Sequence, residues 1–182
     1  MIQSLTHYNN IQIKAFGDWN RAKAFIRNLS PSIRASVLWG QEKAAKELVK
    51  IVKAHIRNQT VPVGTSWAPL ADSTINRKGN SDWFIDNMEY YDSIGTWREA
   101  YTFYAGIRRG EKNRNGIEIA KLANILEMGT DKIPARPLWG PSLDEMGGFD
   151  GMRAIVLAVL EKKLRIEAGD TFTIKKLNRL FG

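Results

Sequence analysis

Four carboxylates between residues 82 and 92 have a spacing that could stack them along one side of a helix. Oxygen ligands of this kind suit hard cations such as Mg²⁺, so a metal site is one interpretation. The other is a solvated face beside the apolar side chains of Trp83, Phe84 and Met88, and we favour it. The four acids are Asp82, Asp86, Glu89 and Asp92.

A nuclease-like centre is distantly suggested by Glu118 and Lys121 together with the upstream Asp92. Such a centre needs the acid and the lysine on one face of a strand, whereas residues three apart point to opposite faces. The two histidines, His7 and His55, lack metal-ligand spacing. Absence of cysteine excludes thiolate zinc sites and disulfides, and no phosphate-binding glycine loop is present. We therefore predict a protein that is not an enzyme and has no metal or cofactor.

The formal charge is +8, and its excess lies in residues 1–58 and 151–182. A basic surface suits nucleic acid or an acidic protein partner, but a charge of this size also keeps a small domain soluble, which we favour. Residues 108–116 form a polar loop whose cations could reach phosphates without reading bases, or could simply solubilise a turn. The candidate DNA-facing residues are Arg108, Arg109, Lys112 and Arg114.

A second group of cations lies at spacings of four, three and four residues, which places them in one stripe of a helix. The stripe could meet phosphate, but an ordinary solvated face opposite a buried one explains it better. Its members are Lys46, Lys50, Lys53 and Arg57.

The elements that would position these residues predict one α+β domain over residues 1–182. A small antiparallel sheet packs against a long N-terminal helix and a C-terminal helix. The sheet is built from a strand at residues 11–16 and a hairpin over 97–119, turned at Asn115 and Gly116. The predicted helices cover residues 18–28, 31–58, 121–128 and, after a start at Pro141 that is weakened by glycines, 152–164.

Periodicity is lost over residues 59–93, which we interpret as an extended arm. Trp67, Leu70 and Trp83 indicate that the arm docks, either on its own domain or on a neighbouring subunit. The helix at 152–164 is apolar on almost every side, so we expect another chain to cover part of it. Residues 170–182 form a short basic tail, and no apolar run approaches the length of a membrane span.

A stiff connector follows the helix that ends at Gly129. Pro134 and Pro137 fix their own φ angles and push the residues before them toward extended geometry. Residues 133–137 therefore cannot join a helix or a central strand. A connector stiffened this much is usually aimed at a partner.

Two blocks of sequence carry a resemblance. The first runs Glu127-Met128-Gly129-Thr130, then Ile-Pro-Ala-Arg-Pro over 133–137, then Pro141-Ser142; the second is Gly-Thr-Ser-Trp-Ala-Pro-Leu over 64–70 with Thr74 and Lys78 beyond it. Together they resemble the tail-completion or neck proteins of long-tailed double-stranded-DNA phages, a group that includes the virion morphogenesis proteins. Asp86-Asn87 departs from the threonine-glycine turn that is common in that family.

The resemblance implies a structural virion protein, made in the host bacterial cytoplasm, that forms a closed ring and completes or connects the tail to the DNA-filled head. It implies a ring of identical copies, usually a hexamer, with portal, adaptor or head-completion proteins and tail-terminator or tail-tube proteins as neighbours. Genomic DNA would pass through without sequence readout. The alternative is a basic, sequence-independent DNA-binding protein.

The arm and the connector would then supply the subunit or partner interface. Replacing Trp67 or Trp139 by alanine should impair ring formation more than folding of the monomer. The proposed interface residues are Trp67, Pro69, Leu70, Pro134, Arg136, Pro137 and Trp139.

Overall fold

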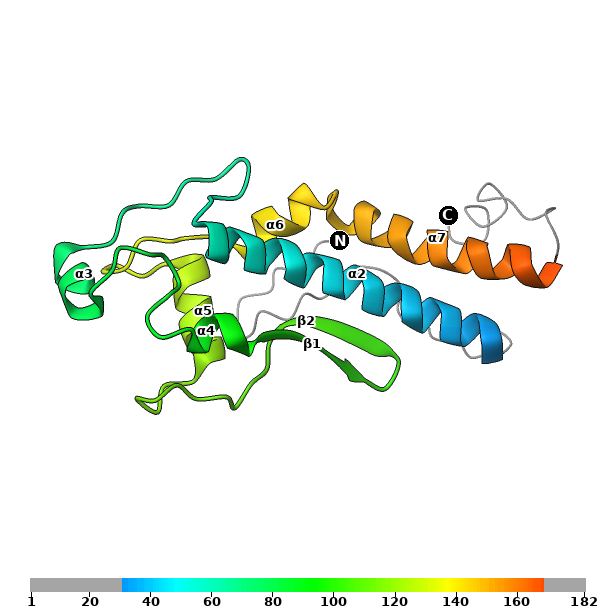
Figure 1. The fold of residues 1–182 in the computed structure, drawn as a ribbon, viewed down its shortest axis with the longest axis horizontal. Helices are drawn as coiled ribbons and strands as arrows, with labels where there is room; N and C mark the ends of the chain where they lie inside the picture. The colour runs from blue at the N-terminus through cyan, green and yellow to red at the C-terminus, as the bar shows by residue number, and fades with distance from the viewer. Residues whose placement is uncertain (1–30, 169–182) are drawn as a thin grey trace, which may run out of the picture.

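The computed structural model describes residues 31–168 and shows an α+β fold (Figure 1). The strand predicted at residues 11–16, the helix at 18–28 and the tail at 170–182 lie outside the described residues. The described elements are α2 (Pro31–Asn58), α3 (Asp72–Lys78), α4 (Glu89–Ser93), β1 (Ile94–Glu99), β2 (Thr102–Ile107), α5 (Ile119–Met128), α6 (Trp139–Glu145) and α7 (Gly148–Ala168).

Helix α2 is the central element and has the bounds that its sequence predicts. It lies between α6 and α7 on one side and the β1–β2 hairpin with α4 and α5 on the other (Figure 1). Its fully buried side chains Leu48, Val52 and Ile56 recur every four residues, which places them on one face of the helix. These side chains form the main core together with residues of α4, α5 and α6.

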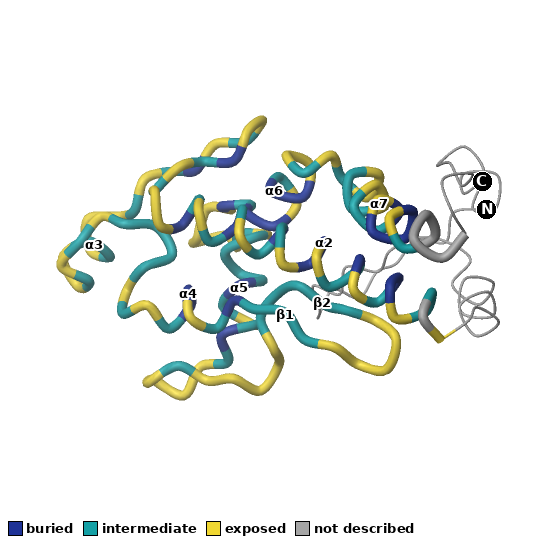
Figure 2. The backbone as a smooth tube through the Cα atoms, turned by 45° about the vertical axis from the view of Figure 1, so that its right-hand side comes forward, coloured by how far each residue is buried: buried dark blue, intermediate teal, exposed yellow. Residues whose placement is uncertain are grey.

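Helix α7 runs back along α2 and makes the most extensive contact between two elements. The helices approach closely at Gly40, where a Cβ atom would lie 2.9 Å from the Cα atom of Val156. Val37, Leu157 and Leu160 form a second apolar cluster beside this crossing. Figure 2 shows buried positions along both helices, together with exposed ones. Helix α2 of the same chain therefore covers much of the apolar face of α7.

The β1–β2 hairpin is shorter than predicted. Ile94 pairs with Ile107 and Glu99 with Thr102, so the chain turns at Ala100 and Tyr101 and not at Asn115–Gly116. The expected hairpin over 97–119 is wrong, because the strand-forming run pairs with itself and stacks Trp97 on Tyr104 at a ring distance of 5.4 Å.

Asn115 and Gly116 do form a turn, but a local one. The side-chain oxygen of Asn113 accepts hydrogen bonds from the backbone of Asn115 and Ile117, and a single bridge joins Lys112 to Glu118. The expected strand at residues 117–119 is reduced to the bridge at Glu118, and α5 begins at Ile119, two residues earlier than predicted. Gly129 ends α5 with φ of 72°, as expected of a residue just beyond a helix.

The helix predicted to start at Pro141 and continue over residues 152–164 is divided into two helices, α6 and α7. Gly147 and Gly148 have φ angles of 89° and 63°, which separates α6 from α7. A Cβ atom on Gly151 would clash with the backbone carbonyl oxygen of Met146, so only glycine fits at this position. The arm also differs from expectation, because it contains the short helices α3 and α4 within its irregular path.

Candidate functional site: the arm–connector junction and its pocket

Arg136 joins the connector to the arm, and its side chain is only 5 % exposed. Its Nε and Nη2 atoms donate to the carbonyl oxygens of Ala68 and Pro69, each at 3.0 Å, and Nη1 reaches the carbonyl of Pro134 at 3.4 Å. Carbonyl oxygens rather than a carboxylate thus satisfy the guanidinium, and burial lowers the pKa of Arg136. We call this contact region, built from residues 67–70 and 134–139, the arm–connector junction.

Trp67 holds the junction from the arm side. Its indole N–H donates to the carbonyl oxygen of Pro137 at 2.9 Å. Its ring packs edge-on against Trp83 at 5.5 Å and against Phe84 at 5.0 Å. The indole of Trp83 donates in turn to the carbonyl of Ala68 at 3.2 Å. Arm and connector therefore satisfy one another's backbone groups in a region without a sheet or a long helix.

Glu127 fixes the far end of the connector. Its carboxylate accepts hydrogen bonds from the backbone N–H groups of Leu138, Trp139 and Gly140, at 2.8 to 3.2 Å. These are the otherwise unpaired donors at the start of α6, where a negative charge also interacts favourably with the helix dipole. Glu127 is not among the predicted site residues. It is the one acidic residue of α5, directly before the connector, and that position could have indicated a role in binding backbone N–H groups.

A second link ties the arm to α6. The Nε2 atom of His55 lies 2.9 Å from Oε2 of Glu145, and Oε1 of Glu145 accepts the backbone N–H of Val63. On its other side, Nδ1 of His55 lies 3.0 Å from the carbonyl oxygen of Thr60. The hydrogen bond from Val63 and the adjacent His55 lower the pKa of Glu145, against the opposing effect of burial.

The seven proposed interface residues all belong to this junction, but they differ in exposure. Trp67, Arg136 and Trp139 are buried, Leu70 and Pro137 are half-buried, and Pro69 and Pro134 are exposed. Trp67 and Trp139 pack inside their own chain. The expectation that their replacement by alanine would impair ring formation more than monomer folding is therefore revised, because deleting a buried indole costs about 3–5 kcal/mol of folding free energy.

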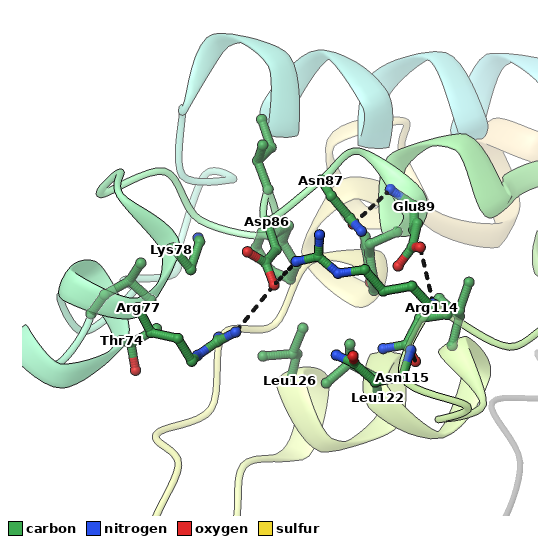
Figure 3. A pocket seen from close by; sticks show the side chains of 16 residues that line it. Thr74, Arg77, Lys78, Asp86, Asn87, Glu89, Arg114, Asn115, Leu122 and Leu126 are labelled. Atoms are coloured by element: carbon green, nitrogen blue, oxygen red, sulfur yellow. Dashed lines mark hydrogen bonds and ion pairs between the residues drawn. The ribbon is translucent and has the colours of Figure 1, made fainter.

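A pocket of about 170 Å³ opens beside the junction, between α3 and α5 (Figure 3). We call it the α3–α5 pocket. Apolar side chains supply part of its wall, namely Leu70, Phe84, Ile85, Ile119, Leu122 and Leu126. Its polar rim includes Asp86, whose Oδ2 atom lies 3.3 Å from Arg77 Nη1 and 3.6 Å from Arg114 Nη2. Lys78 also lines the pocket, and burial lowers its pKa.

The predicted DNA-facing cations are exposed, but they do not act as one group. Arg114 reaches Asp86 in the pocket rim, and Arg108 lies 6.0 Å from the ring of Trp97. Arg109 and Lys112 are exposed on the same loop. Direct contact with DNA stays a prediction for all four residues.

The stripe on α2 has local partners at each cation. Lys46 and Lys50 pair with Glu42 and Glu47, at 2.7 and 3.3 Å. Lys53 lies 4.7 Å from the ring of Tyr91, whose hydroxyl accepts a hydrogen bond from Arg57. This arrangement agrees with the favoured interpretation of a solvated face.

The four acids of residues 82–92 do not converge. Asp86 pairs with arginines, while a carboxylate oxygen of Glu89 accepts the backbone N–H of Arg114 at 3.0 Å. Within residues 31–168, no group of three or more histidine, aspartate or glutamate side chains is placed to hold a metal ion. Asp86 and Glu89 thus link the arm to the loop that contains Arg114.

The chain matches no family model, and searches of curated proteins and of solved structures gave no match. In the described part of the chain, no helix has the length and apolarity needed to cross a membrane.

Proposed function

We propose that the protein is a structural component of a phage neck, in which identical copies form a closed ring that joins the tail to the DNA-filled head. One observation carries the proposal: the two blocks of the resemblance, about 70 residues apart, fold into the single arm–connector junction through Arg136 and Trp67. A shared local structure explains why both blocks occur together in one chain.

The junction suits assembly better than turnover. Arg136 and Glu127 hold the C-terminal part of the connector and the start of α6, so little of that part would have to become ordered when a partner binds. Thr130 and Ile133 close a tight loop by a backbone hydrogen bond of 2.7 Å. Three exposed residues lie in or beside this loop: Met128 at the end of α5, Ile133 in the loop and Pro134 directly after it. These three residues, rather than the buried tryptophans, form the proposed subunit contact.

In the proposed neck the ring, which we expect to be a hexamer, has portal, adaptor or head-completion proteins on one side and tail-terminator or tail-tube proteins on the other. The genome passes along the ring axis without sequence readout. The exposed cations of the 108–114 loop would make only phosphate contacts there.

Sedimentation velocity and negative-stain imaging of the purified full chain test the proposal. We expect annular particles, and we expect Ile133→Ser combined with Met128→Ser to shift them toward monomer without lowering the melting temperature. Matched serine substitution of Ile117, which is exposed elsewhere, is the control. A wild-type protein that stays monomeric at every concentration contradicts the proposal.

A basic DNA-binding protein is the second candidate, and it is favoured by the net charge of +8 and the exposed Arg108, Arg109 and Lys112. It predicts tight binding of free duplex by a monomer or dimer, with a steep dependence on salt. Gel-shift titration at two salt concentrations separates the candidates, since the ring requires only weak affinity.

A further inference from the structure

The α3–α5 pocket has about the volume of a single aromatic ring. Its volume of about 170 Å³ resembles cavities that hold one benzene ring, and part of its wall is apolar. Leu70 lies on the arm, and Leu122 and Leu126 lie on α5, so a ring entering from solvent would contact the arm and α5 at once.

The rim of the pocket has more positive than negative charge. Asp86 alone serves both Arg77 and Arg114, while Lys78 donates to the backbone carbonyl of Asp82 and not to a carboxylate. Glu89 is the other acid in the lining, and it accepts a backbone N–H. With three cations and two carboxylates, the rim is complementary to one additional carboxylate next to an aromatic ring.

The chain carries such a pair at the start of α7. Phe149 is 47 % exposed, and the side chain of Asp150 is 90 % exposed with only a loose contact of 3.9 Å to Arg153. The positive φ angles of Gly147 and Gly148 set the turn that presents this pair. The exposed aromatic residues Trp39 and Tyr101 have no adjacent carboxylate in the sequence.

The pair and the pocket cannot meet within one molecule. The turn between α6 and α7 lies on one side of α2, and α4 and α5 lie on the other (Figures 1 and 2). Two different surfaces that fit one another across copies make a heterologous contact, which repeats and can close into a ring.

We infer that the α3–α5 pocket of one copy binds Phe149 and Asp150 of the next copy, with the ring of Phe149 against the apolar wall and the carboxylate of Asp150 between Arg77 and Arg114. This inference rests on the proposed ring and names the residues that one of its contacts uses.

Cysteine cross-linking tests the contact directly, because the chain has no cysteine of its own. A chain with Phe149→Cys is mixed with a chain carrying Thr74→Cys, which lies in the pocket lining. The matched control replaces Asn76, exposed on the same helix but absent from the lining. We expect the disulfide-linked pair to form with Thr74→Cys in at least about tenfold excess over the control.

Charge reversal supplies the second measurement. Asp150→Lys should weaken self-association by about tenfold in sedimentation, while Asp144→Lys, an exposed position on α6, should not. Mixing Asp150→Lys chains with Arg114→Glu chains should restore part of the loss.

The outcomes separate the two proposals. Rings that form normally, cross-link equally at residues 74 and 76 and ignore Asp150→Lys overturn the inference and leave the proposed function standing. A wild-type chain that never associates overturns both.

Discussion

The arm–connector junction and the α2–α7 helix pair are held together by different physics. The helix pair is an apolar crossing, in which Val37, Leu157 and Leu160 pack beside the close approach at Gly40. The junction is an irregular region in which Arg136, Trp67 and Glu127 capture backbone carbonyl and N–H groups.

The difference shows where side-chain polarity is indispensable. A helix satisfies its own backbone, so the pair needs only shape and apolar surface. A proline-containing connector lacks donors and cannot pair with a strand, so its remaining polar groups need side-chain partners. Losing one such partner removes several hydrogen bonds at once.

Removing the Arg136 side chain should break the junction and have the largest effect. Arg136→Ala leaves the carbonyl of Pro69 without its side-chain donor and the carbonyl of Ala68 with Trp83 alone, and it also removes a buried side chain. We expect a loss of about 3 kcal/mol in the free energy of unfolding. Chemical denaturation measures it, and Arg153→Ala, at a solvent-exposed arginine of α7, is the control. Equal stability of the two variants would show that the hydrogen bonds of Arg136 contribute nothing net.

Adding one methyl group to the helix crossing should have an intermediate effect. Gly40→Ala gains about 0.5–1 kcal/mol of helix propensity, but overpacking against Val156 costs about 1–3 kcal/mol. We expect net destabilisation of about 1–2 kcal/mol, measured by denaturation. An increase in stability would mean that the helices separate easily and that their packing is loose.

A pH titration sharpens the comparison, because the link between the arm and α6 depends on charge. The pKa of Glu145 is lower in the folded protein than its usual 4.5, so its contribution is complete above about pH 4.5 and is lost as the pH falls through the folded value. Melting temperatures of wild type and Glu145→Gln should therefore differ at pH 7 and converge at acid pH. A difference that is constant over this range would argue against the link.

Ser142→Ala should have the smallest effect, and one of opposite sign. The hydroxyl of Ser142 is fully buried in α6 and has no hydrogen-bond partner in the described structure. Removing an unpaired polar group is neutral or stabilising, by up to about 1 kcal/mol. Thermal unfolding checks this, with Ser93→Ala, whose hydroxyl donates to the carbonyl of Tyr90, as the opposite case. Clear destabilisation by Ser142→Ala would reveal a partner of the hydroxyl.

The sequence by itself determined the elements whose signals are local. Pro31 to Asn58 reads as one helix and Gly129 marks the end of another, because periodicity and capping act over a few neighbouring residues. The two prolines of the connector likewise predicted that residues 133–137 form neither helix nor strand.

Only the tertiary structure decided what those elements contact. The sequence left the docking of Trp67 open between its own chain and a neighbour, and the fold buries it against Pro137. It predicted one hairpin turn, at Asn115–Gly116, whereas the strands pair across Ala100 and Tyr101 and stack Trp97 on Tyr104. Contacts between residues far apart in sequence, such as Arg136 with Ala68, depend on the complete packing arrangement, and no local pattern encodes it.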